Sequence, residues 1–104
     1  MKKYWAQGDV VIKPSIIPIE AKEKVGEEKK VIAKGEHTNH AHRIIKGDAV
    51  LFLSPQGMVF IRVKSQEAVI GHETHEDMVL PKGEYEVNQQ IEWDQIEGVR
   101  KVLD

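Results

Sequence analysis

The chain has 104 residues and no cysteine, with 15 Lys and Arg against 17 Asp and Glu, a formal net charge of −2. This length suits one domain, and the lack of cysteine excludes disulfides, thiolate metal sites and cysteine nucleophiles. The charges are spread along the chain, so no basic surface predicts nucleic-acid binding. No apolar run resembles a signal peptide or a membrane span, so we expect a cytoplasmic protein with neither nucleic acid nor membrane as a partner.

Apolar residues recur with a period of two along most of the chain, which predicts β-strands. The first predicted strand is Val10 to Lys13, after a Gly-Asp turn, and the next is Val31 to Lys34. Between them, residues from about 19 to 30 mix charges of both signs, and Gly26 interrupts their helix-forming residues. We expect a charged, mobile loop or long hairpin tip at 19–30, which can include one helical turn.

The second half of the chain continues the pattern. Predicted strands at 49–53 and 58–63 flank Ser-Pro-Gln-Gly, a typical hairpin turn. Strands at 66–71 and 77–80 precede a turn at Pro81-Lys82-Gly83, which leads into a strand at 84–93. In that last strand four apolar residues alternate with polar ones: Tyr85, Val87, Ile91 and Trp93. Val99 to Leu103 is predicted to close the chain.

These segments predict an all-β fold, a single domain over residues 1–104 built as a barrel or sandwich of about eight or nine short strands. The segments Gln7–Ile12 and Lys46–Leu51 resemble each other. Two similar Gly-Asp turns that lead into strands explain this likeness, because Gly and Asp are common turn residues. An internal duplication is the alternative.

All five histidines lie between positions 37 and 75. Neutral imidazole is the commonest side-chain ligand for transition metals near pH 7. His40 and His42 are two residues apart, so on a strand both point to the same face and can reach one ion. His37 lies in a turn region with Thr38 and Asn39, and we leave it outside the principal ligand set.

The second histidine pair is spaced differently. His72 and His75 diverge on a regular strand but converge on a turn, a bulge or one helical turn. We predict that His40, His42, His72 and His75 bind a divalent transition metal, either zinc, iron, manganese or nickel. The alternative is that the histidines are surface or hydrogen-bonded core residues. No residues for an organic cofactor are predicted.

Acidic residues flank both histidine groups: Glu36, Glu73, Glu76 and Asp77. Each can serve as a carboxylate ligand, an acceptor for an imidazole N–H, a general base or simply an exposed charge. Glu73 is the candidate for a catalytic role because it lies between two histidines. His72-Glu73-Thr74-His75 is one residue short of the H-E-x-x-H motif of zinc proteases, so that class is excluded.

The run His40-Ala41-His42-Arg43 and the later Leu80-Pro81-x-Gly83-x-Tyr85 resemble cupins, small β-barrels that hold a metal with an H-x-H pair and later ligands. The resemblance implies a cupin-like barrel over roughly residues 35–90. The chain departs from the cupin pattern where a Glu is expected after H-x-H, since these positions hold Ile44, Ile45 and Lys46. It also has Glu86 where the second motif has His. The same pattern resembles small uncharacterised bacterial and phage proteins, a likeness that implies no activity.

Two functions follow from these observations. The first is a metal-binding β-protein that takes a small-molecule ligand and, if one metal position stays open to water, catalyses a metal-dependent reaction. The second is a non-catalytic interaction or assembly module, a homo-oligomer with surface histidines. The sequence leaves open whether the protein is an enzyme.

Overall fold

The computed structural model describes residues 3–35, 39–89, 91–94 and 98–101. Within these ranges all regular structure is β, and no helix suited to crossing a membrane is found. The strands are β1 (Trp5–Gln7), β2 (Val10–Pro14), β3 (Lys22–Glu23), β4 (Val31–Lys34), β5 (Ala41–Lys46), β6 (Ala49–Leu53), β7 (Val59–Gly71), β8 (Met78–Gln89), β9 (Ile91–Asp94) and β10 (Gly98–Lys101).

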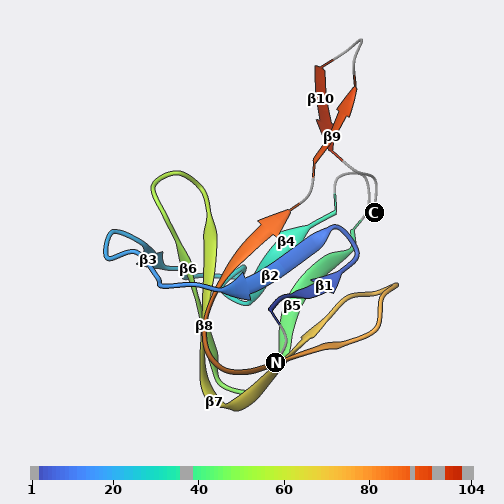
Figure 1. The fold of residues 1–104 in the computed structure, drawn as a ribbon. Helices are drawn as coiled ribbons and strands as arrows, with labels where there is room; N and C mark the ends of the chain where they lie inside the picture. Colours follow the sequence, from blue (N-terminus) through green and yellow to red (C-terminus); the bar gives the residue numbers. More distant parts are fainter. Residues whose placement is uncertain (1–2, 36–38, 90, 95–97, 102–104) are drawn as a thin grey trace.

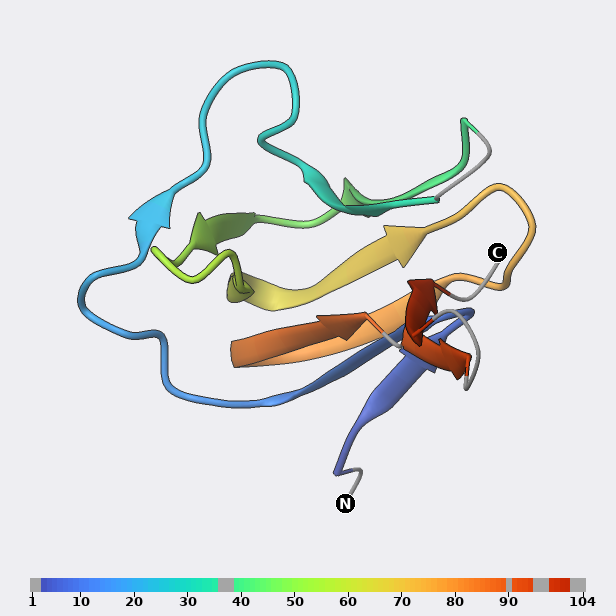
Figure 2. The same ribbon diagram turned by 90° about the horizontal axis from the view of Figure 1, so that it is seen from above.

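Strands β1 to β8 form one antiparallel sheet whose main path runs β1-β2-β8-β7-β5-β4, with β6 also paired to β7 and β3 to β6. Figure 2 shows β5, β7, β8 and β2 side by side in this order. The predicted all-β, single-domain fold is confirmed. The sheet is open, however, and not the closed barrel that was one expectation, because among the described strands β1 and β4 end the path without pairing to each other.

Two long strands organise this sheet. Strand β7 pairs with β6 through Val59–Val63 and with β5 through Val69–Gly71, while β8 follows it along both halves. The register between β7 and β8 shifts between Val63 and Glu67, which marks a bulge. Figure 1 shows both strands curving through the lower part of the molecule. The predicted strands 58–63 and 66–71 are therefore one bent strand.

The predicted turn at Pro81-Lys82-Gly83 is wrong, because these residues continue strand β8. Strand β8 pairs with β2 only over Tyr85–Gln89, so beside Pro81 one edge of the strand has no partner strand among those described. Proline is tolerated at such an edge, where its missing N–H costs no ladder hydrogen bond. Gly83 has a φ of 152°, a conformation that residues with a side chain rarely adopt.

The structure confirms some of the other predicted strands and changes others. The strands at 31–34 and 49–53 are confirmed as β4 and β6. The single strand predicted at 84–93 is divided, since β9 pairs with β10 in a separate two-stranded sheet. The two-residue β3 lies in the segment predicted as a loop. Strand β1 has no counterpart in the predicted elements.

The core consists of apolar side chains from alternate strand positions, as a sheet with one dry face requires. Its largest fully buried apolar members come from β2, β6, β7 and β8: Ile12, Leu51, Ile61, Ile70, Leu80, Val10 and Val63. The alternation predicted for Tyr85 and Val87 is confirmed, because both are buried. The one fully buried polar side chain of comparable size is His42 among the described residues, and it belongs to the site below.

The turn between β5 and β6 depends on close backbone contact at Gly47. Its φ is 90°, and a Cβ atom there would lie 2.5 Å from the carbonyl oxygen of Glu67 and 2.8 Å from the Cα atom of Ala68. We expect Gly47→Ala to lower the free energy of unfolding by about 3 kcal/mol, from backbone strain and this clash together. Urea denaturation measures the change.

Gly57→Ala is the matched control. Gly57 has nearly the same φ, 89°, but no atom lies within 4 Å of the position of its Cβ. Its substitution should cost only the left-handed backbone conformation, about 1–2 kcal/mol. Equal losses for the two variants would contradict the role assigned to the close contact at Gly47.

Candidate functional site: a histidine cluster

The pairing of β5 with β7 brings the two histidine segments together. Arg43 of β5 is paired with Gly71 at the end of β7. Because the strands are antiparallel, the residue before Arg43 and the residue after Gly71 lie opposite each other. These residues are His42 and His72, and β7 then leaves the sheet through a bend over residues 73–75.

The four histidines predicted as ligands form one cluster. The His72 ring lies centrally, with its centroid 4.3 Å from that of His42, 4.7 Å from that of His75 and 5.5 Å from that of His40. The rings of His42 and His75 are parallel, 6.4 Å apart. The prediction that His72 and His75 converge on a turn is thus confirmed. His37, like Glu36, lies outside the described residues.

Three side chains of the cluster have the spacing of a metal-binding group. The ligand atoms of His40, His72 and Glu73 lie within 4.8 Å of one another, and among the described His, Asp and Glu residues this is the group of three that meets the distance. Two imidazoles and one carboxylate are a known ligand set for zinc. The Nδ1 atom of His40 and the Nε2 atom of His72 are shielded from solvent.

Glu73 is held in place by two hydrogen bonds. Its Oε1 atom accepts from the backbone N–H of Ala41 at 2.9 Å, and its Oε2 atom accepts from the Arg43 guanidinium at 3.0 Å. The Ala41 bond, the Glu73 backbone N–H and Arg43 lower the pKa of this exposed carboxyl to about 2. Glu73 is therefore ionised at neutral pH, as a metal ligand must be.

The loop also orients His72. The Nδ1 atom of His72 accepts a hydrogen bond from the backbone N–H of Thr74 at 3.1 Å. In the neutral ring the single proton then lies on Nε2. A metal ion binds an unprotonated nitrogen, so coordination by His72 requires the ion to replace either the Thr74 contact or the Nε2 proton.

His42 is surrounded by polar side chains that the sequence analysis did not identify. Its Nδ1 atom lies 2.8 Å from Oε1 of Gln7, and its Nε2 atom lies 3.2 Å from Oδ1 of Asp9. Burial and then the neighbouring His72 lower the pKa of His42, while Asp9 acts to raise it. The only signal for Gln7 and Asp9 was the Gln-Gly-Asp segment, which the sequence analysis interpreted as turn chemistry.

A groove beside the cluster gives access from solvent. It has a volume of about 630 Å³ and its lining includes Gln7, Gly8, Thr74 and His75. Gly8 allows His75 to lie close to the β1–β2 turn, since a Cβ atom at Gly8 would be 2.6 Å from the Nε2 atom of His75. The groove therefore brings an exposed imidazole within reach of a small ligand.

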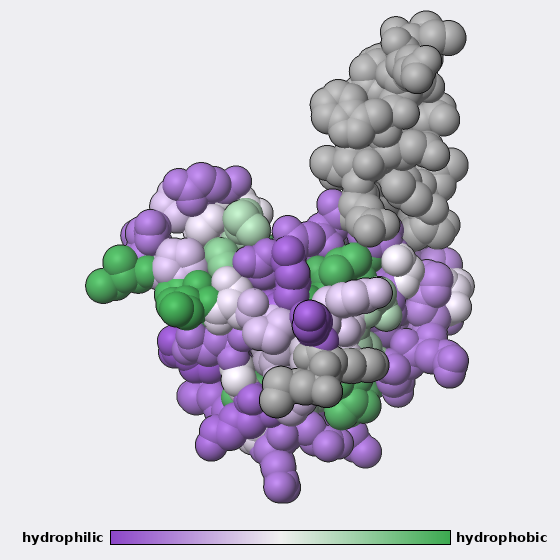
Figure 3. All heavy atoms as spheres, in the orientation of Figure 1, coloured by the Kyte–Doolittle hydropathy of each residue, from purple (hydrophilic) through white to green (hydrophobic). Residues whose placement is uncertain are grey.

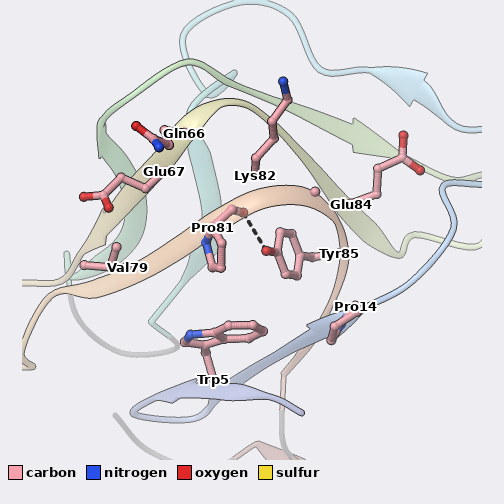
Figure 4. Close-up of a pocket in the computed structure, with 10 residues that line it drawn as sticks. Trp5, Pro14, Gln66, Glu67, Val79, Pro81, Lys82, Glu84 and Tyr85 are labelled. Carbon is pink, nitrogen blue, oxygen red and sulfur yellow. Dashed lines mark hydrogen bonds between the residues drawn. The ribbon is translucent and has the colours of Figure 1, made fainter. Parts of the chain in front are cut away.

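A second, apolar pocket of about 610 Å³ shares Trp5 and Val79 with this groove. Figure 4 shows the Trp5 ring facing Pro81 and Tyr85, with Lys82 directed away from them. The rings of Trp5 and Tyr85 meet edge to face at 5.4 Å, and the Tyr85 hydroxyl donates to the carbonyl oxygen of Pro81 at 2.6 Å. Burial raises the pKa of Tyr85, so this hydroxyl is a hydrogen-bond donor at neutral pH.

A family model described as a domain of unknown function, DUF8820, matches residues 6–90. The chain belongs to this family. No curated protein and no solved structure matches the chain. The DUF8820 match covers Gln7, Asp9 and all four clustered histidines, so the whole site lies within the family domain. The cupin resemblance is not shown by these comparisons.

The four clustered histidines are those predicted as ligands, and Glu73 is the predicted acidic residue beside them. Their proximity is a finding, while metal binding by them stays a prediction. From the sequence, His40 and His42 were expected to converge on one ion as a pair. In the structure, the ring of each contacts the ring of His72. The other flanking acids, Glu76 and Asp77, line the groove.

The pKa of Glu73 predicts a pH dependence of stability in the metal-free protein. A carboxyl whose pKa is about 2 in the folded protein, against an ordinary 4.5, stabilises the fold above pH 4.5. This contribution is lost as the pH falls toward 2. We expect Glu73→Gln to be less stable than the wild type at pH 7, with the two converging near pH 2. Urea denaturation at several pH values measures this, and parallel curves would contradict it.

Proposed function

We propose that this DUF8820 protein binds a divalent transition metal at the histidine cluster, with His40, His72 and Glu73 as ligands. The observation that supports the proposal most strongly is the spacing of these three donors, within 4.8 Å of one another. Ligands of one ion lie about 3–3.5 Å apart when metal–ligand bonds are about 2.0–2.2 Å. Small side-chain rotations therefore complete the site.

The surroundings of the three donors support the same proposal. The Ala41 N–H and Arg43 fix the Glu73 carboxylate on the side that carries the histidines. Such hydrogen bonds to a ligating carboxylate orient it and tune its basicity. His42 and His75, which flank His72, belong to the four-histidine set predicted from the sequence and supply ligands if the ion recruits a fourth.

A three-ligand site leaves a position for water or for a small molecule. A metal ion at that position acidifies bound water and polarises a carbonyl or phosphoryl oxygen. The groove is lined by His75 of the cluster and shares Trp5 and Val79 with the apolar pocket, which favours a small organic ligand with an apolar part. Of the H-x-H pair that resembles the cupin motif, this proposal uses His40 as a ligand and keeps His42 as a candidate for a fourth one.

Zinc titration of untagged, chelator-treated protein tests the proposal. We expect saturable binding by isothermal titration calorimetry, and His40→Ala and Glu73→Gln should each weaken it at least about 10-fold. Glu76→Gln is the matched control, because Glu76 is an exposed glutamate of the same loop outside the group of three. Wild-type protein that takes up no zinc, cobalt or nickel, or a Glu73→Gln variant that binds like the wild type, would contradict the proposal.

A second candidate function, assembly of a homo-oligomer, is favoured by one exposed segment. Ile16, Ile19 and Val25 are 81–101% exposed. Figure 3 shows apolar side chains at the surface on the side of the molecule where β3 lies. Exposed apolar side chains that cluster on one surface are typical of interaction sites.

Light scattering during size-exclusion chromatography tests this candidate. If the wild type is an oligomer and the double variant Ile16→Ser/Ile19→Ser is a monomer, the result supports assembly through this segment. Tyr4→Ser, at a residue that is 59% exposed at the N-terminal end, is the control and should leave the oligomer intact. A monomer in the wild type at high concentration would rule the candidate out.

A further inference from the structure

The first strand, β1, ends the sheet and has one edge without a partner strand. Among the described strands it pairs with β2 alone. A two-residue turn at 8–9 joins the two strands, so Gln7 and Val10 close the hairpin as a pair that exchanges both backbone hydrogen bonds. Because such pairs alternate along an antiparallel ladder with pairs that make no bond, the N–H and C=O groups of Ala6 point away from β2. Ala6 is exposed, so one backbone donor and one backbone acceptor face solvent at this edge.

The groove beside the histidine cluster and the apolar pocket both lie along this edge. Ala6 lines the groove, and Trp5 lines the groove and the pocket. The opposite side of the groove is residues 74–79, and the pocket continues along β8 from Val79. Over residues 78–81, β8 pairs with β7 and with no other described strand. Two strand edges that each lack a second partner therefore flank the groove and the pocket.

The Trp5 end of this edge is apolar. Figure 4 shows the Trp5 side chain extending from β1 toward Pro81 of β8, with the Tyr85 ring beside it. Val79, on the same pocket, is 45% exposed although it is a large apolar residue. Added strands are bound through main-chain hydrogen bonds, and pockets for their alternate side chains supply specificity. The free backbone groups of Ala6 next to an apolar pocket meet both requirements.

The other end of the edge, at Gln7, is acidic. Glu76 and Asp77 line the groove there and are exposed. Neither forms a salt bridge with a described Lys or Arg. The one Lys or Arg among the described residues that line the groove and the pocket is Lys82, which is directed away from the Trp5 ring in Figure 4. An acidic surface of this kind favours a ligand with a positive side chain.

We propose that an extended peptide segment of a partner protein binds along the free edge of β1 as an added strand. Its apolar side chain enters the pocket at Trp5, and a Lys or Arg two residues away lies beside Glu76 and Asp77. The residue between them exchanges backbone hydrogen bonds with Ala6. The spacing of two follows from β1, since Trp5 and Gln7 point to one face and side chains of paired strands lie opposite each other. The proposal goes beyond the proposed function and does not rest on it, because none of these residues is a proposed metal ligand.

A fluorescein-labelled peptide, Ser-Lys-Thr-Leu-Thr-Lys-Ser, tests the proposal by fluorescence anisotropy with untagged protein in EDTA. A Lys stands two residues from Leu on both sides, so the peptide fits in either strand direction. We expect saturable binding that weakens at least about 10-fold when Ser replaces Leu and when Glu replaces both Lys residues. N-methylation of both Thr residues removes the donors for the Ala6 carbonyl and should also weaken binding.

Variants of the protein test the two parts of the edge. Val79→Lys introduces a charge into the apolar pocket from an exposed position, and we expect it to weaken binding at least about 10-fold. Leu53→Lys is the matched control, because Leu53 is 43% exposed on β6 and lines neither the groove nor the pocket. Ala6→Pro removes the outward N–H without removing a hydrogen bond of the sheet and should weaken binding, whereas Ala6→Ser should not.

Each outcome decides the proposal. Binding that is lost in Val79→Lys and Ala6→Pro and retained in Leu53→Lys supports it. A wild type that does not bind the peptide, or binds the N-methylated peptide equally well, overturns it. A peptide-free dimer that Ala6→Pro converts to a monomer shows that a second copy takes this edge, which also overturns it. EDTA keeps the test separate from the proposed function: zinc binding without peptide binding overturns only this inference, and the reverse overturns only the metal site.

A measurement on the wild type removes dependence on the folding of the variants. In ¹H–¹⁵N NMR spectra, addition of the peptide should shift the backbone amide resonances of Ala6 and Val79. The amide of Gly57, in the turn between β6 and β7, should stay unchanged. Shifts that leave Ala6 and Val79 unaffected would overturn binding at this edge.

Discussion

The site depends on the antiparallel register of β5 and β7. The pairing of Arg43 with Gly71 places the histidines at the start of β5 opposite those that follow β7. A slip of one residue would turn every side chain of β5 to the other face. That slip would remove His42 from the interior and expose Ile44, which is buried. The packing of the core and the assembly of the cluster are therefore specified by the same register.

The Gln7 side chain adds a second constraint from the far end of the sheet. Its amide binds the carbonyls of Ile70 and Glu76, so β1 is tied to both ends of the loop that carries His72 and His75. The same side chain accepts from His42. One residue thus fixes the loop and the orientation of the buried His42 imidazole, and such networks specify a unique arrangement when every member is satisfied.

The clustered histidines could be predicted because they lie close together in the sequence. Their polar partners Gln7 and Asp9 could not, because they lie far from the histidines in the sequence. Alternation of apolar residues gave the all-β class and the burial of Tyr85 and Val87. The bend that joins residues 58–71 into β7 was not predictable, since a bulge has weak sequence signals and Ser65 resembles a turn residue. Gln7 and Asp9 reach His42 across 35 and 33 positions, although three strands separate β1 from β5 in the sheet order.

The central claim is that the clustered histidines bind metal, and X-ray diffraction from crystals grown with Zn²⁺ tests it most directly. Data collected on both sides of the zinc absorption edge locate the ion without reference to any assumed ligand. We expect an anomalous peak bounded by His40, His72 and Glu73, within about 2.0–2.2 Å of their donor atoms. Crystals that contain zinc with no peak inside the histidine cluster would contradict the account.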